Sequence, residues 1–179
     1  MTALCALAIT ASALLGQPDA QQSALPDNIV KELNYFVGEW AVEGNLAGKL
    51  LKGRWSSKWA TEKQCLLVTS SLNLDGEQVH ANGVSGWDAG KQEIVTMAFF
   101  SNGVLEDIRY RVASPGVLKG VYTVSAQGEP FKADVEVRTK QPNEWTFKSS
   151  VNVFAMDKKD EFSLRFVRME GKPRKKQGR

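Results

Sequence analysis

The sequence has few of the residues that bind metals or cross-link small folds. It contains two cysteines and one histidine among 179 residues, whereas structural zinc modules and iron–sulfur clusters need four such ligands. Both classes are therefore excluded, and no metal or other cofactor is expected. With 42% hydrophobic residues, a chain of this length can bury enough surface to fold as one domain without disulfides.

Apolar runs long enough to span a membrane are also missing. The N-terminal run at 4–15 is uncharged and rich in Ala and Leu, but it is too short for a membrane helix. Small residues follow it up to Ala20, as expected for a secretory signal peptide. Since no Lys or Arg precedes the run, a retained N-terminal helix is the alternative. We predict a signal peptide at 1–20, a linker at 21–26 and a periplasmic or secreted protein.

Positive charge is concentrated at the C-terminus. The net charge is +3, and residues 168–179 contain six basic residues and one acidic residue, so the rest of the chain is slightly negative. A nucleic-acid-binding domain would instead spread its basic residues over a folded face, so no nucleic-acid partner is expected. We predict that 170–179 is a basic, disordered tail, either solubilising or in weak electrostatic contact with anionic envelope components.

The hydrophobic pattern is helical only at the start of the predicted domain. Ile29, Leu33 and Phe36 recur at intervals of three and four, which indicates a short amphipathic helix that ends at Gly38. From Glu39 the period is two, and nine turn signals separate ten predicted strands. The strands are placed at 39–46, 50–59, 64–73, 78–87, 92–100, 104–112, 117–125, 131–139, 144–154 and 161–169.

These strands are expected to form an up-and-down meander. No segment after Gly38 has a helical pattern long enough for a parallel crossover, so each strand should pair with the next. Closure into a barrel removes the two unpaired edges, and a two-sheet sandwich is the alternative. We predict an all-β fold at 27–169: an up-and-down antiparallel β-barrel of about ten strands with a short N-terminal helix.

Two motifs carry a resemblance to a known superfamily. Gly38-Glu39-Trp40 opens the first strand directly after the helix, and residues 83–88 (Gly-Val-Ser-Gly-Trp-Asp) lie in the fourth. This pattern resembles the lipocalin-like (calycin) barrels, and in particular uncharacterised bacterial calycin-like domains of unknown function. The resemblance covers about residues 27–169. It implies a barrel with a cavity for a small, mostly apolar molecule.

The resemblance also implies structural roles for three residues. Gly38 and Trp40 belong to the Gly-x-Trp signature of these barrels, in which the Trp plugs the closed end under a basic residue of the last strand. Arg165 and Arg168 are both placed to be that residue, and we assign Arg165.

Polar residues that face the barrel interior are the candidate ligand contacts. Tyr110 lies on the apolar face of the sixth strand and Tyr122 on the seventh, where a hydroxyl group could hold an amphipathic ligand, for example by its carboxylate. Trp55 could line the cavity, and His80 is mid-strand, where alternation could direct it either way. We predict that Tyr110, Tyr122, Trp55 and His80 bind ligand, with ordinary core packing as the alternative.

Catalytic groups are scarce. Ser85 lacks the strained Gly-x-Ser-x-Gly turn of a hydrolase nucleophile. The acidic pairs Glu106/Asp107 and Asp134/Glu136 are interpreted as solvated strand residues opposite Lys and Arg. We therefore predict an exported barrel that binds an apolar or amphipathic small molecule without catalysis. The alternatives are a hydrolase or isomerase that acts at the barrel mouth, and a cell-envelope interaction module with a filled barrel.

Overall fold

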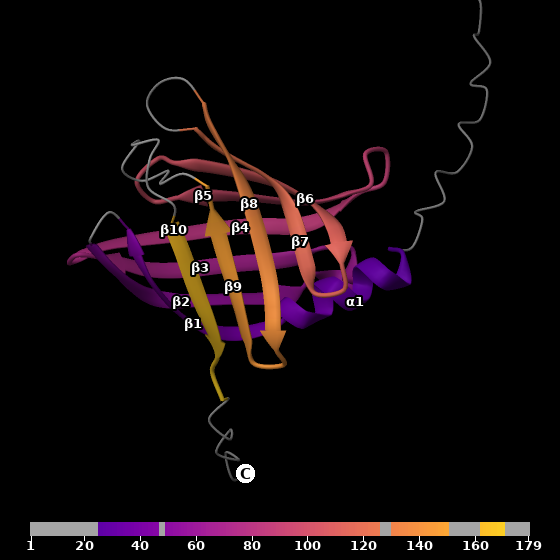
Figure 1. Ribbon diagram of the computed structural model, residues 1–179, viewed down its shortest axis with the longest axis horizontal. Helices are drawn as coiled ribbons and strands as arrows, with labels where there is room; N and C mark the ends of the chain where they lie inside the picture. The colour runs from indigo at the N-terminus through magenta and orange to yellow at the C-terminus, as the bar shows by residue number, and fades with distance from the viewer. Residues whose placement is uncertain (1–24, 47–48, 126–129, 151–161, 171–179) are drawn as a thin grey trace, which may run out of the picture.

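The computed structural model describes residues 25–46, 49–125, 130–150 and 162–170. The predicted signal peptide, most of the linker and nearly all of the basic tail lie outside these residues. Helix α1 spans Asp27–Phe36, and a short 3-10 turn at Thr61–Lys63 joins β2 to β3 (Figure 1). The strands are β1 (Gly38–Leu46), β2 (Lys49–Trp59), β3 (Leu66–Leu74), β4 (Glu77–Asp88), β5 (Glu93–Phe100), β6 (Leu105–Ser114), β7 (Val117–Ser125), β8 (Phe131–Gln141), β9 (Glu144–Ser149) and β10 (Phe162–Arg168).

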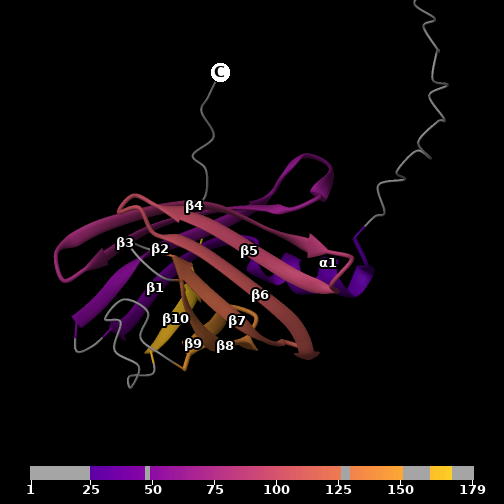
Figure 2. The same ribbon diagram turned by 90° about the horizontal axis from the view of Figure 1, so that it is seen from above.

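The sheet is a closed antiparallel barrel. Each strand pairs with the next, and β1 pairs with β10 to complete the ring. Figure 2 shows the strands wrapping around a common interior, with α1 beside one end. The predicted ten-stranded barrel is confirmed, and the sandwich alternative is wrong. Within the described residues, no helix is long and apolar enough to cross a membrane.

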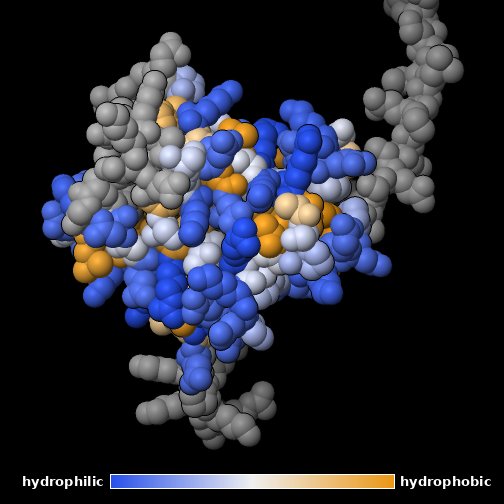
Figure 3. Space-filling model, in the orientation of Figure 1, coloured by the Kyte–Doolittle hydropathy of each residue, from blue (hydrophilic) through white to orange (hydrophobic). Residues whose placement is uncertain are grey.

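The period of two in the sequence separates the inner face of the barrel from the outer face. On β8, Ala133, Val135 and Val137 are buried, while Lys132 and Asp134, which precede the first two of them, are exposed. Inward side chains from all sides form one hydrophobic core together with α1. On the outer face seen in Figure 3, hydrophobic residues are interspersed with hydrophilic ones.

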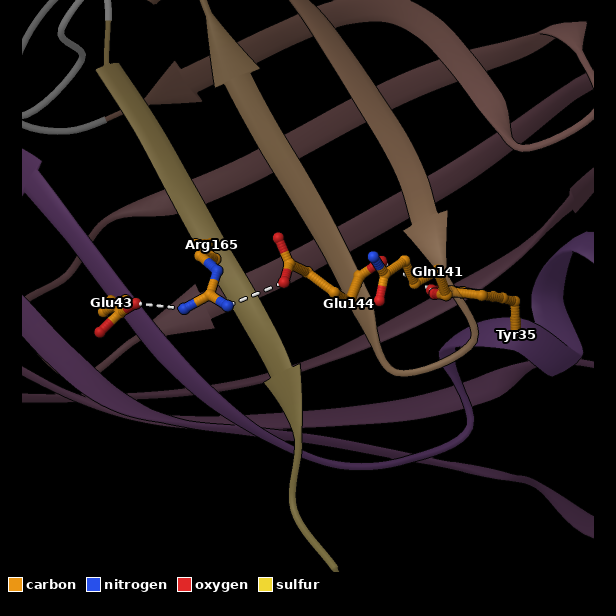
Figure 4. Close-up of polar contacts among 5 residues, drawn as sticks. All are labelled: Tyr35, Glu43, Gln141, Glu144 and Arg165. Carbon is orange, nitrogen blue, oxygen red and sulfur yellow. Dashed lines mark hydrogen bonds and ion pairs between the residues drawn. The ribbon is translucent and has the colours of Figure 1, made fainter.

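Side-chain hydrogen bonds between α1 and the sheet hold the helix at one end of the barrel. Ser57 Oγ donates to the Phe36 carbonyl at 2.9 Å, and Trp59 Nε1 donates to Asn34 Oδ1 at 2.8 Å. The Tyr35 hydroxyl donates to the carbonyls of Gln141 and Glu144 in the β8–β9 hairpin (Figure 4). With Ile29, Leu33 and Phe36 buried, the helix closes this end.

Trp40 lies at the centre of the closed end. Its side chain has no exposed surface, and its indole N–H donates to the Phe36 carbonyl at 2.8 Å. The Arg168 guanidinium lies over the ring, 4.1 Å from the centroid, a cation–π contact. Arg168 also donates to the carbonyls of Val37 at 2.7 Å and Tyr35 at 2.8 Å. It therefore joins the last strand to the segment between α1 and β1.

Gly38 is required by this arrangement for two reasons. Its φ is +129°, a conformation that residues with a Cβ rarely adopt. A Cβ at this position would also lie 2.6 Å from Arg168 Nη1. The glycine thus gives the arginine room to reach Trp40.

The assignment of Arg165 as the residue above Trp40 is wrong. Arg165 lies opposite Glu43 on β1, whereas Arg168 lies opposite Trp40. Alternation places Arg165 on the outer face, where it donates to Glu43 Oε1 at 2.7 Å and Glu144 Oε2 at 2.8 Å (Figure 4). Since inward and outward positions alternate along a strand, the two arginines, three residues apart, face opposite sides.

Replacement of Trp40 by Ala should lower the free energy of unfolding by about 3–5 kcal/mol, because it opens a cavity in the core and removes a buried hydrogen bond. Urea denaturation measures the loss. Trp40→Phe keeps an aromatic ring and should cost less. A loss below about 1 kcal/mol for Trp40→Ala, the range of a typical point mutation, would show that Trp40 is not a plug.

Candidate functional site: the barrel cavity

The barrel encloses a cavity of about 140 Å³. Side chains of α1 and of the strands form its walls, and most of these side chains are aliphatic or aromatic. Leu33 and Phe36 of α1 line it, so the helix that closes the barrel also forms part of the cavity wall. The polar side chains that line it are Ser70, Ser85, Thr96, Glu106, Tyr110 and Tyr122.

An aromatic cluster connects the cavity to the plugged end. Trp145 stacks on Phe166 with centroids 3.5 Å apart and contacts Trp40 edge-to-face at 6.0 Å. Trp55 and Phe36 pack against Trp145 in the same edge-to-face manner, at 5.5 and 5.1 Å. Such pairs stabilise beyond the area that they bury. The buried indole N–H of Trp145 has no hydrogen-bond acceptor among the described residues.

Glu106 is the carboxyl group of this cavity. Along β6, Glu106, Ile108 and Tyr110 line the interior. The Tyr122 hydroxyl, from the neighbouring β7, donates to Glu106 Oε2 at 2.8 Å. Within the described part of the chain, no hydrogen-bond donor contacts Glu106 Oε1. The cavity therefore contains an acidic group with one satisfied oxygen and one open oxygen.

Burial changes the titration of all three groups. Desolvation raises the pKa of Glu106 to about 7, and the hydrogen bond from Tyr122 opposes this only in part. Burial, and then the negative charge of Glu106, raise the pKa values of Tyr110 and Tyr122 well above their usual range. Both tyrosines are therefore neutral at physiological pH, while Glu106 changes charge close to neutrality.

Glu106 is half-buried and lines the cavity, so its interpretation as a solvated residue opposite Lys and Arg is wrong, whereas that of its neighbour Asp107 holds in part. Asp107 faces outward and pairs with Arg109 at 3.3 Å, as expected of an outer-face carboxylate. The signal for Glu106 was present in the sequence, because it lies two residues before Ile108 and four before Tyr110. The alternation that places those residues inside also places Glu106 inside.

Three of the four predicted ligand-binding residues line the cavity. Tyr110 and Tyr122 are 7% and 2% exposed, and Trp55 is partly buried and packs edge-to-face against both Trp145 and Phe166. His80 lies outside this cavity, so the prediction that it shares a site with the two tyrosines is wrong; it lines a second, more open pocket together with Trp55. It precedes the inward-facing Ala81, so its exposed side chain lies on the outer face of β4.

Two further polar residues of the cavity wall, Ser85 and Thr96, satisfy each other. Ser85 Oγ and Thr96 Oγ1 lie 2.5 Å apart and bond to each other inside the cavity. Across the described residues, no group of three or more His, Cys, Asp and Glu side chains could hold a metal ion. Within the described residues, the polar groups with unused hydrogen-bonding capacity include Glu106 Oε1, the Tyr110 hydroxyl and the Trp145 indole N–H in the cavity wall, and Asp107 Oδ1 outside it.

The chain matches no known family model. It is similar to the outer membrane usher protein FasD of Escherichia coli, with 27% identity over 131 residues, but it spans only 15% of that protein's length. A de novo designed fluorescence-activating β-barrel aligns with 76% of this chain and 96% of its own, at TM-score 0.44 and 16% identity. A redesigned β-barrel bound to DFHBI covers 77% and 98%, at TM-score 0.39 and 14% identity. These similarities assign the chain to no family.

Glu106→Gln should remove a pH dependence of stability. Because the carboxyl pKa rises from 4.5 to about 7 on folding, the folded state binds more protons than the unfolded state between these values. The stabilisation is complete below pH 4.5 and is lost as the pH rises through 7, a fall of about 3 kcal/mol in the free energy of unfolding. Chemical denaturation from pH 4.5 to 8.5 measures this.

The glutamine variant should show a correspondingly flatter profile and be more stable than the wild type at pH 8.5. Asp134→Asn, which removes an exposed outer-face carboxylate, should retain the wild-type slope. Equal slopes for the wild type and Glu106→Gln would contradict the burial of this carboxyl.

Proposed function

We propose that the barrel binds one small, mostly apolar molecule in its cavity. The observation that carries the proposal is the interior space of about 140 Å³, lined mainly by aliphatic and aromatic side chains. An engineered apolar cavity of about 150 Å³ stays dry and binds benzene. Affinity here would come from apolar area, and a few polar groups would orient the ligand. The size suits a single ring or a short chain.

The calycin-like assignment is part of the same proposal. In the calycin barrels that the sequence resembles, a glycine and a tryptophan open the first strand, and a basic residue of the last strand covers the tryptophan. Gly38, Trp40 and Arg168 have these relations here, and they support a barrel closed at one end.

The two alternative functions differ in their support. A filled barrel is disfavoured by the cavity itself. An isomerase or hydrolase has one observation in its favour, because Glu106 and Tyr122 face each other inside the cavity. Acetophenone incubated with the protein in D2O would gain deuterium beside its carbonyl if Glu106 acts as a base. It would stay unlabelled if the cavity only binds it.

We further propose that the protein is exported to the periplasm or secreted. The apolar run and small residues of 1–20 support this, as does the similarity to an outer membrane protein over 131 residues. N-terminal sequencing of protein from its host should find Gln21 as the first residue. An intact Met1 would contradict the export proposal.

Toluene, an uncharged one-ring probe, should bind to the purified protein with one-to-one stoichiometry and a Kd of about 1 mM or lower. Isothermal titration calorimetry measures both quantities. Ala98 lines the cavity, so Ala98→Leu should fill it and weaken binding at least tenfold.

Ala41→Leu is the matched control, because Ala41 is exposed on β1 and the same added volume lies outside the barrel. It should leave toluene binding unchanged. If the folded wild type does not bind toluene, or if both leucine variants weaken binding equally, the cavity is not the binding site.

A further inference from the structure

The described residues that line the cavity supply one charged side chain, and its charge is negative. Glu106 is the one carboxyl of the cavity among the described residues, and no Lys, Arg or His side chain of that part of the chain lines it. The two arginines of β6 face outward, where Arg109 pairs with Asp107 and Asp88, and Arg111 pairs with Glu93. Among the described residues, a ligand inside the barrel therefore meets a single carboxyl group and no counter-charge for an anion.

Of the two tyrosines that line the cavity, Tyr122 is already engaged. The Tyr122 hydroxyl donates its proton to Glu106 Oε2, so it is not available to an anionic ligand. An anion near Glu106 would also suffer like-charge repulsion within a largely apolar wall. The negative charge of Glu106 acts on Tyr110 as well, so a carboxylate held by either tyrosine would meet this repulsion and is disfavoured.

A ligand that carries a hydrogen-bond donor is favoured where an anion is disfavoured. Glu106 Oε1 accepts no hydrogen bond from the described residues, so a donor placed there would satisfy it. A buried cation is tolerated when it is paired with a carboxylate and hydrogen-bonded. The apolar wall meanwhile accommodates the rest of the molecule.

From this arrangement we propose that the cavity selects small apolar ligands that carry an ammonium or other hydrogen-bond donor, and that it rejects carboxylates. The proposal rests on the binding function proposed above and adds the chemical class of the ligand. Glu106 is the residue that determines the class, and the aromatic and aliphatic wall determines the size.

The preference for amines should increase with pH. Tyr110 on β6 and Tyr122 on β7 are the titratable groups that face Glu106, and both are neutral up to high pH. Its cross-strand neighbours are Ala98 on β5 and Val124 on β7, which carry no charge. Ionisation of Glu106, centred at about pH 7, is therefore the change that strengthens an amine contact.

Four one-ring compounds test the proposal: toluene, benzyl alcohol, benzylamine and benzoate. Their affinities are measured by calorimetry at pH 5.5 and 8.5. At pH 8.5 the wild type should bind benzylamine at least tenfold more tightly than toluene and benzoate at least tenfold more weakly, with benzyl alcohol between benzylamine and toluene. At pH 5.5 the advantage of benzylamine should shrink.

Two variants separate the local charge from the overall charge. Glu106→Gln should abolish the advantage of benzylamine over toluene while toluene still binds, and Asp134→Asn should leave the wild-type order unchanged. Benzoate binding as tightly as benzylamine, or an amine advantage that survives in Glu106→Gln, would overturn the ligand class alone. Failure of toluene and the other three compounds to bind would overturn the binding function itself.

Discussion

The pairing of β1 with β10 is the interaction on which the rest of the structure depends, because it turns a ten-stranded sheet into a closed wall. Arg168 strengthens this junction from the last strand by its contact with Trp40 and its hydrogen bonds to two carbonyls beside α1. Gly38 makes the contact possible by leaving space for the guanidinium. Closure removes both sheet edges and separates an interior from solvent.

The separation of the barrel interior from solvent gives the Glu106 carboxyl its raised pKa. A carboxyl on the outer face, such as Asp107, keeps an arginine partner, whereas Glu106 has a neutral tyrosine as its donor and an apolar surround. The cost of burying its charge favours the protonated form and raises its pKa. The same cost makes a donor or cationic ligand the natural partner of the ionised form.

Periodicity determined how far the sequence could predict the structure. Ten strands, their order and the inward direction of Tyr110 and Tyr122 follow from the alternation of apolar and polar residues. Local charge was the weaker guide, because it suggested a solvated Glu106, while alternation from Ile108 places it inside. Arg165 and His80 are further cases in which the face of the strand that carries the side chain, and not the residue type, decides the role.

The cavity itself could not be predicted in this way. Its volume depends on how the side chains of opposite strands fill the interior, and no alternation pattern records whether five tryptophans leave space or occupy it. Hydrogen bonds across the interior, such as that from Tyr122 to Glu106, depend equally on the three-dimensional packing.

The central claim is that Glu106 is an interior carboxyl group in an apolar cavity. Its side-chain carboxyl carbon can be followed directly by NMR in isotopically labelled protein as the pH is raised, with the resonance assigned by its loss in Glu106→Gln. The structure predicts a titration midpoint at about pH 7. A midpoint close to 4.5, the value of an ordinary glutamate, would contradict an interior location of this group.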